Sequence, residues 1–143
     1  MNTCRKMNTS KKKRSGFTII ELMIVIVIVA ILVSLAYPSY IQYVRKAKRG
    51  EAQQLLLNWA INQEIWRSNN VSYNDVVDTS SPNFIVPGHD DYDFDAPAFD
   101  AATYTLTATA LNDQVNDVAR DGTSCLVLTL TQAGAKTEPA CWD

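Results

Sequence analysis

The chain has 143 residues, enough for one domain and an additional segment. Six basic and no acidic residues precede residue 15, whereas the remaining chain contains seven basic and fifteen acidic residues. The part of the chain after residue 15 is therefore acidic and repels a phosphate backbone over most of its surface. Nucleic acid is not expected as a partner.

An uninterrupted apolar run extends from Phe17 to Tyr37. As a helix it would be about 30 Å long, which matches the hydrocarbon thickness of a bilayer. Lipid satisfies no backbone hydrogen bonds, so a lone spanning segment must be helical. Basic residues at 11–14 favour a cytoplasmic N-terminus, although a second basic cluster at 45–49 follows the run. A buried helix of a soluble protein is the alternative.

Glu21 is the one ionisable side chain within this run. A carboxylate in the membrane costs roughly 2.5–3.5 kcal/mol on insertion scales, so Glu21 is expected to have a partner.

Two processing sites compete. A secretory signal peptide would be cut after Ala36, at the small-residue site 34–36, whereas the other cut lies before the apolar run, between Gly16 and Phe17. Translation could begin at Met1 or at Met7, because the tripeptide MNT occurs at both positions.

The stretch SGFTIIELMIVIVIVAILVSLAYPSY resembles the type IV pilin class III signal. In that family a dedicated inner-membrane peptidase cuts after a leader glycine and methylates the new N-terminal amine. The resemblance implies a cleaved basic leader at 1–16 ending in Gly16, with Phe17 as the N-methylated first residue. Glu21 would be the fifth mature residue, and its carboxylate would pair with the amine of a neighbouring subunit during assembly. Pairing with its own amine is the alternative.

Pro38 follows the apolar run and predicts a helix kink, because proline removes one helical hydrogen bond. Beyond it, apolar residues recur at three- and four-residue steps: Ile41, Val44, Ala52, Leu55, Leu56, Trp59 and Trp66. One helix is therefore expected over 17–69, with 17–37 as the transmembrane segment or filament core and an amphipathic second half. Asn69 and Asn70 are expected to end it in left-handed geometry.

The basic cluster at 45–49 is interpreted as a solvated collar above the lipid headgroups, with binding of DNA or anionic lipid as alternatives. Trp59 and Trp66 are expected to pack in a core rather than to form a ligand platform.

Residues 70–143 are expected to form a globular head. Weak periodicity and turn signals predict a long loop over 70–100, although YDF at 92–94 could be a strand. Period-two alternation predicts strands over 101–111 and 124–132, joined by a hairpin loop. The expected fold is α+β, a long N-terminal helix packed on a small antiparallel sheet, as in type IV pilins.

Cys125 and Cys141 lie 16 positions apart in the head, which is expected to be exported. An exported location favours a disulfide over two buried thiols. Cys4 belongs to the leader and has no role in the mature protein. The ending CLVLTLTQAGAKTEPACW and the stretch AYPSYIQYVRKAKRGEA resemble minor pilins of the PilE-like group. Ala30 departs from the pattern, since many pilins have a helix-loosening glycine there.

No catalytic constellation is present, and His89 is the one histidine. Asp91, Asp93 and Asp95 follow a D-x-D-x-D spacing, but the glycine and glutamate of a calcium-binding EF-hand loop are missing. Neither an enzyme nor a metal or cofactor site is expected. Alternation predicts that Tyr92 and Phe94 pack inward while the aspartates face water.

The resemblance implies a minor pilin of a type IV pilus, which supports pilus assembly, twitching motility, adhesion or DNA uptake. Its partners would be other pilins in a helical filament, the prepilin peptidase and methyltransferase, the inner-membrane assembly machinery and the bilayer. It would be a single-pass inner-membrane protein with a periplasmic head, and then part of an extracellular pilus. The alternatives are a pseudopilin of a type II secretion system, a pilin whose head binds a ligand such as DNA, and a secreted enzyme.

Mass spectrometry of the mature protein from membranes is expected to show a chain that begins with N-methylated Phe17. A chain that begins at Tyr37 would establish secretory cleavage instead.

Overall fold

The computed structural model describes residues 16–74 and 86–142, in two compact units that meet at Pro38. Helix α1 (Ile19–Asn69) contains 51 residues and includes Pro38, so the prediction of one helix over 17–69 is confirmed within two residues. The kink at Pro38 stays a prediction. The expected leader falls almost wholly on residues 1–15, outside the described part of the chain.

The first unit is an uncovered aliphatic helix. Every residue from 16 to 38 is exposed, and the large hydrophobic side chains between 19 and 37 are 50–82% exposed. By length and composition this part of α1 can cross a membrane.

Helix α1 ends at Asn69, as expected, but not by left-handed geometry. Neither Asn69 nor Asn70 has a positive φ. Their side-chain amides instead donate to carbonyl groups of the last turn, Asn69 to Ile65 at 3.3 Å and Asn70 to Trp66 at 2.9 Å. Asparagine therefore ends the helix through its side chain.

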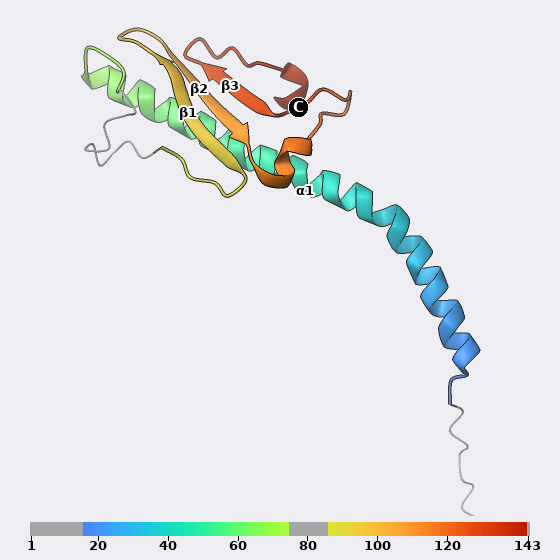
Figure 1. Cartoon of the computed structure of the whole chain (residues 1–143). Coiled ribbons are helices and arrows are strands. Elements are labelled where there is room, and N and C mark those ends of the chain that lie inside the picture. The colour runs from blue at the N-terminus through green and yellow to red at the C-terminus, as the bar shows by residue number, and fades with distance from the viewer. Residues whose placement is uncertain (1–15, 75–85, 143) are drawn as a thin grey trace, which may run out of the picture. The chain divides into compact units, whose positions relative to one another are not determined.

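The head contains a three-stranded antiparallel sheet in the order β1 (Tyr92–Phe99), β2 (Tyr104–Ala110) and β3 (Val127–Thr131), which lies along the second half of α1 (Figure 1). The 3₁₀ helix η1 (Asn112–Asn116) lies between β2 and β3, and η2 (Pro139–Trp142) ends the described chain. The two strands expected from alternation are both present and are paired with each other.

Strand β1 corrects the expectation of a continuous loop over 70–100. It extends through 92–99, and the pairing with β2 is interrupted by a bulge between Asp95 and Ala98. Pro97 lies in this bulge, where a missing N–H costs no ladder bond. Tyr92 and Phe94 are buried while Asp93 and Asp95 are exposed, which confirms the predicted alternation for these four residues. Asp91 does not face water as expected, because its side chain is only 15% exposed and pairs with Lys48.

One hydrophobic core joins the helix to the sheet. Helix α1 contributes Ala52, Leu56 and Trp59, so core packing of Trp59 is confirmed, whereas Trp66 is only partly buried and is not part of this core. The sheet contributes the inward residues of its strands: Tyr92, Phe94, Tyr104, Leu106, Ala108, Ala110, Leu128 and Leu130. The intervening threonines of β2 are only partly buried, because successive strand side chains point to opposite faces.

Candidate functional site

The start of α1 carries the residues expected to act in processing and assembly. Phe17 is 86% exposed, and Thr18 Oγ1 accepts a hydrogen bond from the backbone N–H of Glu21 at 3.2 Å. Threonine followed three residues later by glutamate is the spacing of a capping box, and the helix dipole favours a carboxylate in the first turn. Glu21 thus has a local role at the helix start that the sequence reasoning missed. Its pairing with a neighbouring subunit stays a prediction.

The basic cluster at 45–49 does not form a solvated collar, so that interpretation is wrong for most of its members. Three of its four cations pair with aspartates of the head: Arg45 with Asp113, Lys48 with Asp91 and Arg49 with Asp117. Arg45 binds its partner through two nitrogens, at 2.9 and 3.0 Å. This hydrogen bonding lowers the pKa of Asp113 and raises the pKa of Arg45.

The pair between Arg49 and Asp117 is buried, with exposures of 4% and 3%. Arg49 Nη1 lies 2.7 Å from Asp117 Oδ2 and 3.2 Å from Sγ of Cys125. Loss of one partner from a buried pair typically costs about 3–5 kcal/mol, because the remaining charge is left uncompensated.

Gln114 completes this buried network from η1. Its Nε2 donates to the backbone carbonyl of Arg45 at 2.9 Å and lies 3.1 Å from Asp117 Oδ2. The hydroxyl of Tyr92 also lies 3.0 Å from Nε2. Burial raises the pKa of Tyr92 to about 12, so this hydroxyl remains protonated at neutral pH. The network therefore connects α1, β1 and η1.

A signal for these contacts exists in the sequence. Arg45 and Arg49 are four residues apart on one helix, and Asp113 and Asp117 have the same spacing 68 residues later. Residues four apart lie on the same helical face, so the two cations can meet two anions with matched spacing. Opposite charges with this pattern indicate two linked ion pairs, but the pattern does not show which pair is buried.

The disulfide between Cys125 and Cys141 adjoins this network, and both residues are fully buried. Their Cα atoms lie 5.7 Å apart. Gln53 on α1 donates to the backbone carbonyl of Cys141 at 2.6 Å. The C-terminal loop is therefore held both to the segment just before β3 and to the helix.

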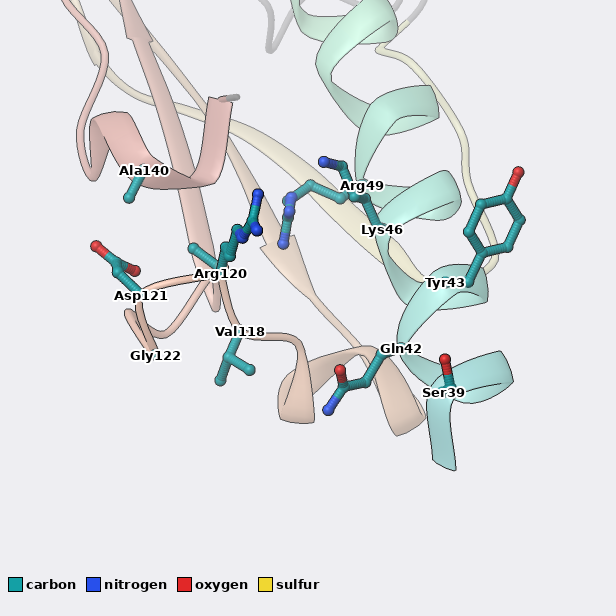
Figure 2. Close-up of a pocket in the computed structure, with 11 residues that line it drawn as sticks. Ser39, Gln42, Tyr43, Lys46, Arg49, Val118, Arg120, Asp121, Gly122 and Ala140 are labelled. Atoms are coloured by element: carbon teal, nitrogen blue, oxygen red, sulfur yellow. The ribbon is translucent and has the colours of Figure 1, made fainter. Parts of the chain in front are cut away.

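A cleft of about 800 Å³ opens beside this network, between α1 and the turn at 118–122 (Figure 2). The helix lines it with Ser39, Gln42, Tyr43, Lys46 and Arg49, and the head lines it with residues 118–122 and Ala140. Gly122 has a φ of +89°, which favours glycine, and its N–H donates to the carbonyl of Ala119 at 3.0 Å. This bond closes the turn that carries Arg120.

The cleft contains cations that the head leaves free. Lys46 and Arg120 are exposed, and neither forms an ion pair within the described part of the chain. Figure 2 shows Arg120 extending from its turn on the side of the cleft opposite Lys46. Asp121 is the one anion in the lining, and its carboxylate accepts a hydrogen bond from the Thr123 N–H at 2.9 Å, which lowers the pKa of Asp121. Lys46 and Arg120 are therefore the cations of the lining that an anionic group at this cleft could contact.

His89 lies on the segment just before β1. Its Nε2 is 3.2 Å from a carboxylate oxygen of Glu51, and its Nδ1 accepts the N–H of Asp91 at 3.0 Å. Together with the Lys48–Asp91 pair, these contacts hold the start of β1 on α1. Among the described residues, no group of three or more His, Cys, Asp or Glu side chains could hold a metal ion.

Two family descriptions match consecutive parts of the chain. Residues 11–37 match the prokaryotic N-terminal methylation motif. Residues 38–129, more than half of the chain, match the family described as type IV minor pilin ComP, DNA uptake sequence receptor.

Curated relatives match over shorter stretches. A fimbrial protein of Neisseria meningitidis serogroup A is 42% identical over 73 residues, covering 46% of this chain and 41% of that protein. The type IV major pilin protein PilE1 of Neisseria gonorrhoeae is 42% identical over 71 residues, covering 45% and 32%. Fimbrial protein EcpC of Eikenella corrodens is 49% identical over 45 residues, covering 32% and 29%. The chain thus spans less than half the length of each of these three relatives.

Arg49→Met is expected to lower the free energy of unfolding by about 3–5 kcal/mol, because Asp117 would keep a buried charge without its partner. Lys48→Met is the matched control, since its pair with Asp91 is partly exposed and contributes about 0–1 kcal/mol. Urea unfolding of the full-length protein in detergent, followed by tryptophan fluorescence, measures both. Equal losses in the two variants would contradict the role of burial.

Proposed function

Because the chain belongs to the type IV minor pilin ComP family, we propose that it is a minor pilus subunit whose head takes part in DNA uptake. The observation that supports assembly is the exposed aliphatic helix of residues 19–37, in which Glu21 is the one charged side chain. Such a surface needs a cover, which lipid supplies before assembly and other pilins supply afterwards. The role is structural rather than catalytic.

Processing comes first in this proposal. The prepilin peptidase removes the leader at 1–16 by cutting between Gly16 and Phe17, and the new amine of Phe17 is methylated. Residues 17–37 then cross the inner membrane with the N-terminus cytoplasmic and the head periplasmic, as the basic residues at 11–14 favour. The assembly machinery afterwards transfers the subunit into an extracellular pilus.

Glu21 fixes the axial position of the subunit. Opposite charges in a low-dielectric surrounding attract strongly, and an unpaired charge there is penalised. The carboxylate of Glu21 therefore pairs with the Phe17 amine of a neighbouring subunit at one axial offset. The hydrogen bond between Thr18 and the Glu21 N–H leaves both carboxylate oxygens available for this contact.

Glu21→Ala is expected to preserve membrane insertion, because alanine is less costly in lipid than a carboxylate. Cleavage should also persist, since the scissile bond lies four residues away. The amount of this subunit in sheared pili should fall sharply, because the neighbour's amine would lose its partner. Glu21→Asp should be intermediate, since its carboxylate is one methylene short.

Immunoblots of membranes and sheared pili measure the membrane level, the leader cleavage and the pilus content of each variant. Total pilus mass is not the readout, since a minor subunit can be lost while the fibre persists. Normal content of Glu21→Ala in sheared pili would refute the pairing.

A DNA-binding role for the head rests on the family description and on the cleft. The acidic balance of the chain argues against nucleic acid, and the pairs of Asp91, Asp113 and Asp117 with cations of α1 leave the net charge unchanged, so a DNA contact has to be local. Lys46 and Arg120 carry charges that these pairs leave free. We therefore assign a phosphate contact to the cleft between them, which positions DNA without reading its sequence.

Two phosphate contacts predict weak and strongly salt-dependent binding. The logarithm of the affinity falls with the logarithm of the salt concentration with a slope of about −0.9 per phosphate contact. Two contacts therefore lower the affinity roughly tenfold between 50 and 200 mM salt. Replacing Lys46 and Arg120 together by glutamine should weaken binding of a short duplex and flatten this slope. Arg67→Gln combined with Lys136→Gln, which removes two positive charges at positions that do not line the cleft, is the control. If the double variant keeps the same salt dependence, the cleft is excluded as the site that contacts the DNA phosphates.

A further inference from the structure

The cleft between α1 and the turn at 118–122 begins close to the apolar run along the chain. Ser39 and Gln42 lie at one end of it (Figure 2). The polar headgroup layer is about 5–7 Å thick on each side of a bilayer, which corresponds to roughly four residues of helix. Lys46 follows Tyr37 by nine residues, so it lies at most about 14 Å beyond the end of the apolar run, and a bend at Pro38 only shortens this height.

Two exposed cations of the cleft are available to a headgroup phosphate at this height. Lys46 and Arg120 form no ion pair within the described part of the chain, and Asp121 is the one such anion in the lining. Two cations and one anion leave an excess of one positive charge. Lys46 is within about 8 Å of the headgroup layer, which is one Debye length at physiological ionic strength. Each excess positive charge there strengthens binding to an anionic leaflet about fivefold.

Exposed aromatic and apolar side chains adjoin these cations. Tyr40, Tyr43 and Lys46 recur at three-residue steps, so successive members share a helical face, and the two tyrosines are 64% and 74% exposed. Val118 lines the cleft from the head and is 47% exposed. Tyrosine is enriched at membrane interfaces, because its ring is apolar and its hydroxyl stays hydrated. Tyrosines, an apolar tip and cations at increasing height are the side chains that an interfacial lipid contact uses.

We propose that this cleft binds the phosphate of an anionic phospholipid headgroup while the subunit is held in the membrane. The inference rests on the proposed membrane insertion, but it requires neither a pilus nor DNA. A phospholipid and a DNA strand both present a phosphodiester, so a bound headgroup occupies the contact that we assign to DNA. Release from the bilayer then frees Lys46 and Arg120, which restricts DNA binding at the cleft to subunits that have left the membrane.

A photo-crosslinking residue at position 118 of the full-length chain tests this contact in nanodiscs. One set contains phosphatidylcholine, which has no net charge, and the other also contains anionic phosphatidylglycerol. Lipid adducts at position 118 should be about fivefold more abundant in the anionic set, because the cleft has one excess positive charge. The same residue at position 71 is the matched control. Val71 is 89% exposed beyond the end of α1 and does not line the cleft, so it should give no lipid adduct in either set.

Replacing Lys46 and Arg120 together by glutamine should lower the adduct yield in anionic nanodiscs to the yield in neutral ones. Arg67→Gln combined with Lys136→Gln removes two positive charges outside the cleft and should leave the yield within about twofold. Inorganic phosphate and sodium chloride at equal ionic strength should lower the yield equally, because both only screen the contact.

Three results would overturn the proposal: an equal yield in the two lipid sets, a yield that the double glutamine variant does not lower, and an equal yield at positions 71 and 118. A larger loss with inorganic phosphate than with sodium chloride would assign the cleft to free phosphate instead of lipid. Failure of the unaltered chain to insert into either set of nanodiscs would refute the proposed function.

Discussion

The buried ion pair between Arg49 and Asp117 determines how the head lies on its helix. Two opposite charges removed from water are tolerated only when they meet each other with good geometry. A displacement of the head along α1 by one helical turn would bring one arginine opposite the other aspartate and leave one arginine and one aspartate without a partner, so only the observed position satisfies both pairs. The pair therefore sets the register of the head, and Arg45 with Asp113 repeats the same contact four residues earlier on both segments. The disulfide at Cys125 lies against the same guanidinium and closes the C-terminal loop over it.

The surfaces available for function follow from this pairing. Because three cations of the 45–49 cluster pair with the head, Lys46 is the member of that cluster without an ion pair among the described residues, and it lines the cleft together with Arg120. An apolar groove lined by Leu57, Ile61 and Ile65 lies farther along α1 and faces away from the core. One helix thus carries three separate surfaces: an aliphatic segment for lipid or filament, a weakly basic cleft and an apolar groove.

Much of the fold is predictable because its signals are local. The span of α1 follows from the apolar run and the three- and four-residue steps after it, and β2 and β3 follow from period-two alternation. Strand β1 is harder to predict, since Pro97 and the aspartates have low strand propensity and a bulge absorbs the proline. The cluster at 45–49 was misinterpreted for a different reason. Cations beside a membrane segment are ordinarily solvated, and the partners of Arg45 and Arg49 lie 68 residues away, so only the tertiary fold shows that Arg49 is buried.

The state of the Arg49 guanidinium tests the central role of the buried pair most directly. In nitrogen-resolved NMR spectra of the detergent-solubilised protein, a guanidinium fixed by Asp117 should show separate, slowly exchanging Nη proton signals. Arg120 provides the internal reference, because it is exposed and should show averaged, fast-exchanging signals. Protected and separated signals for Arg49 alone would support the account. Signals of Arg49 that average and exchange as fast as those of Arg120 would contradict it.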